Sequence, residues 1–233
     1  MATSQPGQEV FDAYPELARQ ISALCERSPW RITGVSALLY DEAYVYFEVA
    51  KPKHWRRRTD GVLLVGIGGI GGSIEEGETA LGCLEREAQE EIGLAIEVIS
   101  ASEVHFVYEE MWRASLALER RAHPLPILFT ISANLYRQRE LAPWPTLAII
   151  TFLARPLGQP ALGDLFGLLA VPHGVWRDLL QADEIPHTEA LQAHGVHLVT
   201  ASPLPTGAVF VPTWTARSLQ CLVRAGIAPL RAK

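Results

Sequence analysis

The order of apolar and polar residues along the chain predicts helices and strands that interleave. Apolar positions at helical spacing predict helices over residues 9–27, 79–92 and 212–225. Runs rich in apolar, β-branched and aromatic residues predict strands over 32–40, 43–50, 61–67, 97–108, 127–134 and 146–155. Asp41–Glu42 fits a tight turn between the first two strands. The interleaved order predicts an α/β or α+β fold.

Two further segments have the composition of short helices. Residues 109–126 predict an inserted helix that ends at His123–Pro124. Residues 163–181 predict one or two short helices, broken near Pro172.

Length, composition and charge narrow the class of protein. The chain has 233 residues, 48% of them hydrophobic, and a net charge of −6. These values favour one folded domain with a sizeable core and argue against DNA as a partner. A bound metal ion can still reverse the local charge for an anionic substrate. The chain has three separated cysteines and no signal-like N-terminus. No apolar run approaches the ~20 residues of a membrane helix. We therefore expect a cytoplasmic location away from membranes.

A glycine run, GIGGIGG at residues 66–72, follows the apolar residues 62–65 and matches the dinucleotide fingerprint G-x-G-x-x-G. That fingerprint requires a helix directly after the glycines, whereas helical periodicity here begins near Thr79. A P-loop is excluded because Gly72 stands where the lysine is needed. We expect Gly66 and Gly68 to permit close strand packing, and Gly71 and Gly72 to open a turn towards the next helix.

The helix predicted over residues 79–92 carries three carboxylates on one edge. Glu87, Glu90 and Glu91 project within about 100° of one another, beside an apolar face made by Leu81, Leu84, Ala88 and Ile92. Thr79 is suited to cap the helix, and Gly93 is suited to end it. A solvated acidic face would explain the spacing but not the glycines before it. Repulsion among three oxygen-bearing groups instead favours a hard divalent cation, Mg²⁺ or Mn²⁺.

Residues 72–94, GSIEEGETALGCLEREAQEEIGL, resemble the Nudix box of the Nudix hydrolase superfamily. The fixed positions of the box are occupied by Gly72, Glu78, Arg86, Glu87, Ala88, Glu90, Glu91, Gly93 and Leu94. The resemblance implies an α/β/α sandwich with a mixed sheet over residues 31–180. An N-terminal helix (9–27) and a C-terminal extension (181–233) would complete a single domain over 1–233.

The resemblance also implies an activity and a set of roles. Proteins of this family hydrolyse a pyrophosphate bond in a nucleoside diphosphate linked to another moiety, with divalent metal ions. Glu87 and Glu91 would be the principal metal ligands, with contributions from Glu90 and the Gly71 carbonyl. Arg86 would orient a ligating glutamate, while Glu78, together with Gly72 and Gly93, would shape the loop and helix. The partner would be a small nucleotide-derived pyrophosphate, and a homodimer would be common in the family.

Several questions stay open at the level of sequence. The general base could be Glu90, or Glu109 or Glu110 on a later loop, unless those two are ordinary surface acids. Glu110 stands at the position where ADP-ribose hydrolases of the family carry a proline, which makes it a candidate substrate contact. Two other functions compete with hydrolysis of a small nucleotide, namely a non-catalytic nucleotide sensor and an RNA 5′-end pyrophosphohydrolase.

The most basic segment of the chain, KPKHWRRRTD at 51–60, lies between the second and third predicted strands. Basic runs are usually exposed and solvated. The same residues could instead contact phosphates through Arg56 and Arg57, with Trp55 offering a stacking face. This segment is the only feature that prompts the RNA alternative.

Overall fold

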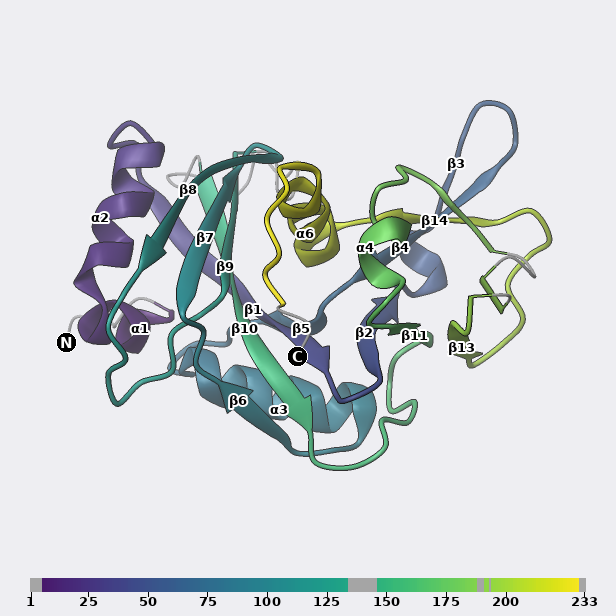
Figure 1. Ribbon diagram of the computed structural model, residues 1–233, viewed down its shortest axis with the longest axis horizontal. Helices are drawn as coiled ribbons and strands as arrows, with labels where there is room; N and C mark the ends of the chain where they lie inside the picture. The colour runs from purple at the N-terminus through teal and green to yellow at the C-terminus, as the bar shows by residue number, and fades with distance from the viewer. Residues whose placement is uncertain (1–5, 134–145, 188–190, 193, 231–233) are drawn as a thin grey trace.

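A computed structural model describes residues 6–133, 146–187, 191–192 and 194–230 (Figure 1). Its helices are α1 (Gln8–Ala13), α2 (Pro15–Leu24), a 3₁₀ turn η1 (Pro52–His54), α3 (Ala80–Ile92), α4 (Trp176–Leu179) and α6 (Trp214–Arg224). The longer strands are β1 (Trp30–Tyr40), β2 (Tyr44–Val49), β4 (Leu63–Gly68), β7 (Glu103–Tyr108), β8 (Met111–Ala117), β9 (Leu128–Ser132), β10 (Thr146–Pro156) and β11 (Gly167–Pro172). The short strands are β3 (Arg56–Arg57), β5 (Ile70–Ser73), β6 (Ile96–Ile99), β12 (Ile185–Pro186), β13 (His197–Thr200) and β14 (Val209–Pro212).

The strands form one mixed sheet. Its main path runs β12-β14-β4-β2-β1-β10-β9-β7-β8, and β5 pairs with β1 beside this path. The pairs β1/β10, β14/β4 and β7/β9 are parallel, and the other pairs are antiparallel. β1 and β10 therefore lie at the centre, with the glycine run carried by β4 and β5 close by.

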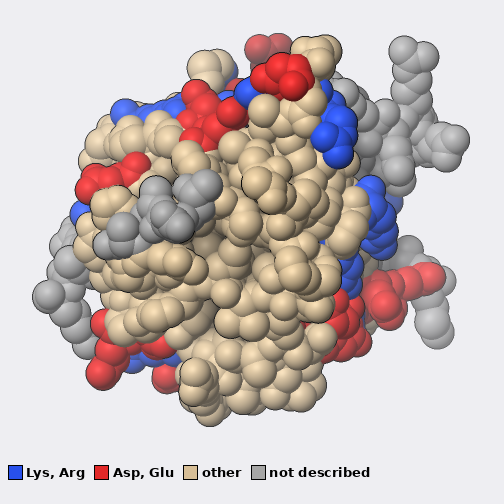
Figure 2. Space-filling view, turned by 90° about the vertical axis from the view of Figure 1, so that its right-hand side faces the viewer, with Lys and Arg blue, Asp and Glu red and all other residues tan. Residues whose placement is uncertain are grey.

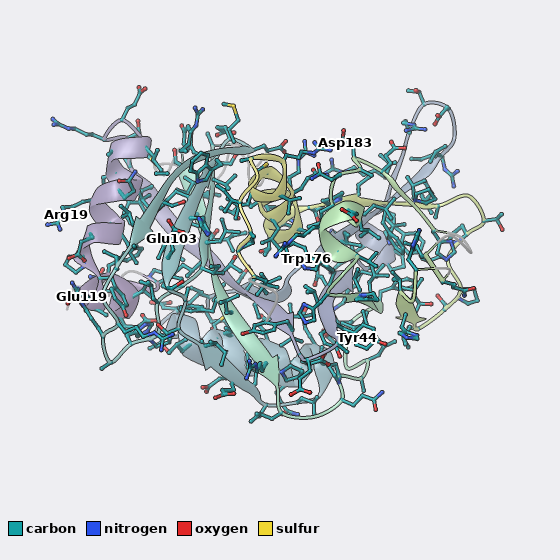
Figure 3. The ribbon with its side chains drawn as sticks, viewed as in Figure 1. Arg19, Tyr44, Glu103, Glu119, Trp176 and Asp183 are labelled. Atoms are coloured by element: carbon teal, nitrogen blue, oxygen red, sulfur yellow. The ribbon has the colours of Figure 1, made fainter. Side chains whose placement is uncertain are left out.

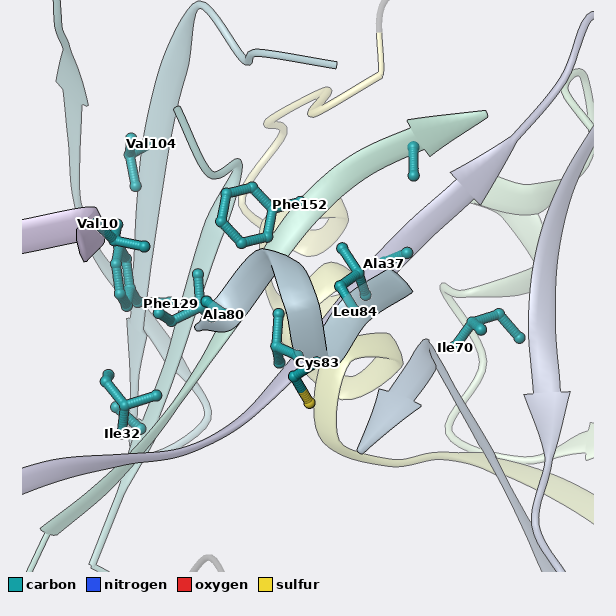
Figure 4. Packing of buried hydrophobic residues seen from close by; sticks show 14 of the residues in the cluster. Val10, Ile32, Ala37, Ile70, Ala80, Cys83, Leu84, Val104, Phe129 and Phe152 are labelled. Atoms are coloured by element: carbon teal, nitrogen blue, oxygen red, sulfur yellow. The ribbon is translucent and has the colours of Figure 1, made fainter. Parts of the chain in front are cut away.

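The sheet buries apolar side chains on both faces, and the side chains of β1 point alternately into the two cores that result. Val35 and Ala37 point into a core that contains α1, α2 and α3, whereas Leu38 points into a second core that contains α4 and α6. Figure 4 shows Ala80, Cys83 and Leu84 of α3 close to Ala37 and Phe152 in the first core. α3 lies below the sheet in Figure 1 and α6 above it. The predicted α/β/α sandwich with a mixed sheet is confirmed.

Several predicted elements are confirmed with small shifts of their ends. They are the strands now seen as β1, β2, β4, β9 and β10, and the helices α3 and α6. The turn after β1 is present because the Asp41 carboxylate accepts hydrogen bonds from the amides of Ala43 (2.7 Å) and Tyr44 (2.8 Å). The predicted end of the strand 127–134, at Asn134, lies outside the described residues.

The N-terminal helix predicted over residues 9–27 is two helices. α1 ends before Tyr14, and Pro15 begins α2 at its first position. Proline has no amide to donate inside a helix but is well suited to the first turn, so it starts a new helix there. The strand predicted over 97–108 is likewise divided into β6 and β7, which pair with different neighbours, β10 and β9.

Two predicted helices are wrong. Residues 109–126 contain the strand β8, which forms a hairpin with β7 around Glu109 (φ 49°) and Glu110 (φ 58°). Residues 163–181 contain the strand β11, paired with both β2 and β13, and only α4 after Pro172 is helical. In both cases pairing with a strand distant in sequence overrides the local helical preference.

The distribution of surface charge and the lengths of the helices indicate whether the protein could bind nucleic acid or span a membrane. Figure 2 views the molecule from the end that carries β3 and β13, where charged side chains of both signs lie around a largely uncharged centre. Among the residues that the structure describes, no continuous basic surface covers this face. Within the described residues, no helix has the length and apolar character needed to cross a membrane.

Candidate active site

Helix α3 begins and ends as its sequence predicts. Thr79 accepts a hydrogen bond from the Gly82 amide (3.0 Å), which satisfies one of the free amides of the first turn. Gly93 takes the left-handed conformation (φ 69°) that ends many helices. The apolar face of α3 is buried in the first core through Ala80, Cys83, Leu84, Ala88 and Ile92. This packing fixes the direction in which the acidic edge faces.

Three carboxylates lie against the glycines of β4 and β5. The Glu91 carboxylate accepts a hydrogen bond from the Gly71 amide (2.8 Å). A Cβ atom at Gly72 would lie 2.5 Å from the carboxyl carbon of Glu87, and one at Gly68 would lie 3.2 Å from a carboxylate oxygen of Glu48. Any larger residue at Gly72 would therefore displace Glu87. The glycines make room for acids rather than for a dinucleotide.

Arg86 connects three of the carboxylates predicted for the site. Its guanidinium donates to both carboxylate oxygens of Glu78 (2.9 and 3.1 Å) and to Glu87 (2.9 Å). It also reaches Glu90 (3.2 Å) and the backbone carbonyl of Ser73 (3.3 Å). The two hydrogen bonds to Glu78 lower the pKa of Glu78. Arg86 thus holds the end of β5, the loop before α3 and Glu87 together.

The remaining negative charges are poorly compensated. Burial raises the pKa of Glu91, and the negative charges of Glu48, Glu87 and Asp164 raise it further. The hydrogen bond from the Gly71 amide lowers this pKa but does not outweigh the other effects. Burial also raises the pKa of Glu48, and Lys51 only partly offsets it because that ammonium is paired with Asp164 (2.8 Å). Glu91 is 7% exposed. These carboxylates repel one another at a site that is partly shielded from water, and this repulsion favours the binding of a cation.

The glycines differ from their predicted role in one respect. Gly71 and Gly72 do not open a turn; they lie within β5 and pair with Ser36 and Val35 of β1. The turn follows later, at Glu76–Gly77. Strand pairing with β1 places the Gly71 amide where it can reach Glu91. The expected close packing is present at Gly68, which faces Glu48.

The three acids of α3 that are predicted for the metal site, Glu87, Glu90 and Glu91, do not share one environment. Glu87 and Glu91 face the glycines, whereas the side chain of Glu90 is 53% exposed and reaches only towards Arg86. The backbone carbonyls of Glu90 and Glu91 accept hydrogen bonds from the amides of Asp164 and Gly163 (2.9 Å each). Hence the loop before β11 also covers the end of α3.

The acids predicted on the later loop are engaged elsewhere. Glu109 accepts hydrogen bonds from the Ser132 hydroxyl (2.9 Å) and the Ala133 amide (2.6 Å). Glu110 forms an ion pair with Arg217 of α6 (2.9 Å). The structure does not bring either carboxylate to the glycines.

The basic segment forms the projecting strand β3, which pairs with the start of β4. Arg56 and Arg57 are exposed, and Arg57 donates to the Gly61 carbonyl (2.7 Å). The Trp55 indole donates to the Ala50 carbonyl (2.6 Å) and packs edge-on against Phe166. Trp55 thus contributes to packing beside the second core.

Sequence reasoning missed Glu48 and the start of α6. Glu48 is the one acid in the otherwise apolar strand β2, YVYFEV, and that contrast was the available signal. A cavity of about 130 Å³ lies beside the carboxylates, and its lining includes Glu48, Gly68, Gly71, Trp214 and Thr215. A larger cavity of about 760 Å³ lies under residues 227–230 and includes no residue of β5 or α3, so we do not assign the chemistry to it.

The donor atoms at the glycines fit a hard divalent cation. Glu48, Glu87 and Glu91 offer only carboxylate oxygens, the preferred ligands of Mg²⁺ and Mn²⁺. Within the described part of the chain, no group of three or more His, Cys, Asp or Glu side chains is already arranged to hold a metal ion. Binding would therefore require these side chains to turn towards a common point. The mutual repulsion of their charges makes that turn favourable once a cation is present.

The fold and the site together define an α/β/α sandwich whose acidic helix meets a glycine-rich strand. The model of the NUDIX domain family matches residues 30–132, which include β1, β5 and all of α3. This part of the chain is therefore similar to the NUDIX domain family. No curated protein matches the chain.

Solved structures of Nudix proteins resemble the chain weakly. A NUDIX-family hydrolase from Clostridium perfringens has 13% identity and a TM-score of 0.37, and the match covers 66% of this chain and 86% of that one. An ADP-ribose pyrophosphatase from Streptococcus suis has 11% identity and a TM-score of 0.33, over 84% and 92% of the two chains. A MutT NUDIX hydrolase from Burkholderia pseudomallei has 16% identity and a TM-score of 0.29, over 58% and 74%.

Proposed function

We propose that the protein hydrolyses the pyrophosphate bond of a nucleoside diphosphate linked to another moiety, and that it requires Mg²⁺ or Mn²⁺. The observation that carries the proposal is the convergence of Glu48, Glu87 and Glu91 on the glycines of β4 and β5. This convergence joins two elements, β2 and α3, that are separated by residues 50–79. A solvated acidic helix face would not need glycines to admit its carboxylates.

The residues have distinct proposed roles. Glu87 and Glu91, with Glu48 opposite them, would hold the cation, and the Gly71 carbonyl would be a further ligand. A bound divalent cation would neutralise charge on the phosphate oxygens and lower the pKa of a bound water. Arg86 orients Glu87 through its hydrogen bond, and the Gly71 amide orients Glu91.

Glu90 is the proposed general base. Its carboxylate is exposed at the edge of the site, where it can take a proton from water, while Glu109 and Glu110 are paired with other groups. Glu90 reaches the site only through Arg86, so its position depends on that residue. Replacing Arg86 would therefore disturb Glu87 and Glu90 together.

A small substrate is favoured over RNA and over a purely sensing role. The indole of Trp55 is already packed, and the face in Figure 2 carries charges of both signs. Arg56 and Arg57 stay candidate phosphate contacts at the edge of β4. A sensor without catalysis would not require Arg86 to align acids that face one another.

The test is phosphate release from a panel of nucleotide sugars, dinucleoside polyphosphates and nucleoside triphosphates, with Mg²⁺ or Mn²⁺. Glu87→Gln and Glu91→Gln are expected to lower kcat at least a hundredfold, an order-of-magnitude figure for losing charge stabilisation in the transition state. Glu85→Gln is the matched control because Glu85 is exposed on the same helix. Full activity in both site variants would contradict the metal assignment.

Thermal unfolding measures cation binding without depending on turnover. Mg²⁺ or Mn²⁺ should raise the Tm of the parent protein and of Glu85→Gln, because a ligand that binds only the folded state stabilises it. The rise should be much smaller for Glu91→Gln and Glu48→Gln. Equal rises in all four proteins would place the cation elsewhere.

We further propose that the protein is cytoplasmic, as its composition suggests, and that it forms the homodimer that the family resemblance implies. Light scattering on the purified protein tests the dimer directly, since one chain has a mass of 25.6 kDa. A monomer at micromolar concentration would exclude the homodimer. Fractionation of cells that produce the protein tests the location.

A further inference from the structure

The chain beyond the NUDIX match is built into the candidate active site. β14 runs parallel to β4, with Pro212 opposite Ile67. The amide and the hydroxyl of Thr213 both donate to the Ile67 carbonyl (2.8 and 2.9 Å). α6 therefore starts directly beside the glycine run, although more than 140 residues separate the two in sequence.

Two further glycines of the run accommodate the start of α6. A Cβ atom at Gly66 would lie 3.1 Å from a methyl group of Thr213, and one at Gly69 would lie 3.1 Å from Thr215. The Thr215 hydroxyl is buried and hydrogen-bonded to the Ser36 hydroxyl of β1 (2.6 Å). The first turn of α6 is thus fixed against β1, β4 and β5.

Between these two threonines, Trp214 has three unusual properties. It lines the cavity of about 130 Å³ together with Glu48, Gly68 and Gly71. It is 39% exposed, although its neighbour Thr215 is buried. Its φ of 47° is in the left-handed region, which bulky residues rarely adopt and which is retained mainly at functional sites.

We infer that Trp214 is a substrate-binding residue whose indole stacks on the nucleobase. The inference rests on the proposed function, because the carboxylates that share the cavity would face the pyrophosphate. A flat, exposed aromatic ring beside a pyrophosphate site matches the flat aromatic part of a nucleotide. The C-terminal segment would then determine which moiety is accepted, and the acids of α3 would determine the bond that is cleaved.

The test compares two ligands that share one bridge and differ in the nucleoside. The ligands are α,β-methylene-ADP and methylenediphosphonate, neither of which can be hydrolysed at the bridge, and calorimetry in the presence of Mg²⁺ gives their Kd. Trp214→Ala should raise the Kd of α,β-methylene-ADP about tenfold, the usual effect of losing one stacked base, and should leave that of methylenediphosphonate unchanged. Trp214→Phe should restore most of the affinity because it retains an aromatic face.

Trp112→Ala is the matched control. Trp112 is similarly exposed, at 42%, but lies on β8 and does not line the cavity. The Trp112→Ala variant should bind both ligands with the same Kd as the parent protein. Circular dichroism of each variant confirms that it is folded.

The outcomes separate this inference from the proposed function. Hydrolysis of nucleotides with an unchanged Kd and KM in Trp214→Ala would overturn the stacking role and leave the proposed hydrolysis intact. Trp214-dependent binding of α,β-methylene-ADP without turnover of any substrate would overturn hydrolysis and support stacking. An equal loss of affinity for both ligands in Trp214→Ala would also overturn the inference, because the residue would then act on the pyrophosphate or on folding.

Discussion

At the scale of single residues, Gly71 is constrained both by its φ angle and by the backbone beside it. Its φ is 146°, and a Cβ atom there would overlap the Val35 carbonyl and lie 2.7 Å from Cα of Ser36. Both are backbone atoms of the central strand β1, so neither can move aside cheaply. Gly77 also has a positive φ (80°) but faces open space.

We therefore predict different costs for two glycine replacements. Gly71→Ala should lower the free energy of unfolding by about 2–4 kcal/mol, because strain and a backbone clash combine. Gly77→Ala should cost about 1 kcal/mol, the price of a left-handed residue alone. Urea unfolding measures both values. Equal losses of unfolding free energy in the two variants would show that the contact with β1 does not contribute to the cost at Gly71.

At the scale of elements, the β1–β2 hairpin is held at its turn by Asp41. The carboxylate accepts hydrogen bonds from the Ala43 and Tyr44 amides and from the Tyr46 hydroxyl. Burial alone would raise the pKa of Asp41, but these hydrogen bonds outweigh it and hold the pKa below its usual range. The charged form is therefore the one that stabilises the hairpin carrying Glu48.

This shift predicts a stability difference that depends on pH. Because the pKa of Asp41 is lowered by folding, its contribution is complete above the unfolded value, about 3.9, and is lost as the pH falls through the folded value. Asp41→Asn should cost about 1–3 kcal/mol at pH 7, and the difference from the parent protein should shrink below about pH 4. Urea unfolding from pH 7 to pH 3 measures it, with the exposed neighbour Glu42→Gln as control. A difference that does not vary with pH would contradict the assignment.

The elements also show which local signals sufficed. α3 was predictable because its cap, its apolar face and its final glycine all lie within fifteen residues. β8 was not, since its partner β7 determines its conformation and its own residues also suit a helix. The same holds for β11, which lies between β2 and β13.

At the scale of the whole molecule, one sheet is shared by two cores. Leu84 of α3 lies in the first core and Leu219 of α6 in the second, and both are fully buried. Trp176 of α4 also belongs to the second core, and Asp183 nearby pairs with Arg217 and Arg224 of α6 (Figure 3). β1 and β10 border both cores, so we expect the chain to unfold as one unit.

We therefore predict that truncations in either core shift one common transition. Leu84→Ala and Leu219→Ala should each lower the free energy of unfolding by about 2–5 kcal/mol, while Leu157→Ala, at an exposed position, should change it by less than about 0.5 kcal/mol. Circular dichroism and tryptophan fluorescence, followed in parallel during urea unfolding, should coincide in all variants. Separate transitions in Leu219→Ala would divide the chain into two domains.

The sequence by itself determined helix α3, its cap, its acids and the resemblance to the Nudix box. These features depend on residues that are neighbours in sequence, so their spacing carries the information. Only the tertiary structure revealed Glu48 opposite Glu91, the packing of Thr213 and Thr215 against the glycines, and Trp214 at the cavity. These contacts join β2, β5 and α6, and strand pairing and core packing over long sequence separations bring them together. The glycine run belongs to both accounts: its pattern is visible in the sequence, and its partners are visible only in the fold.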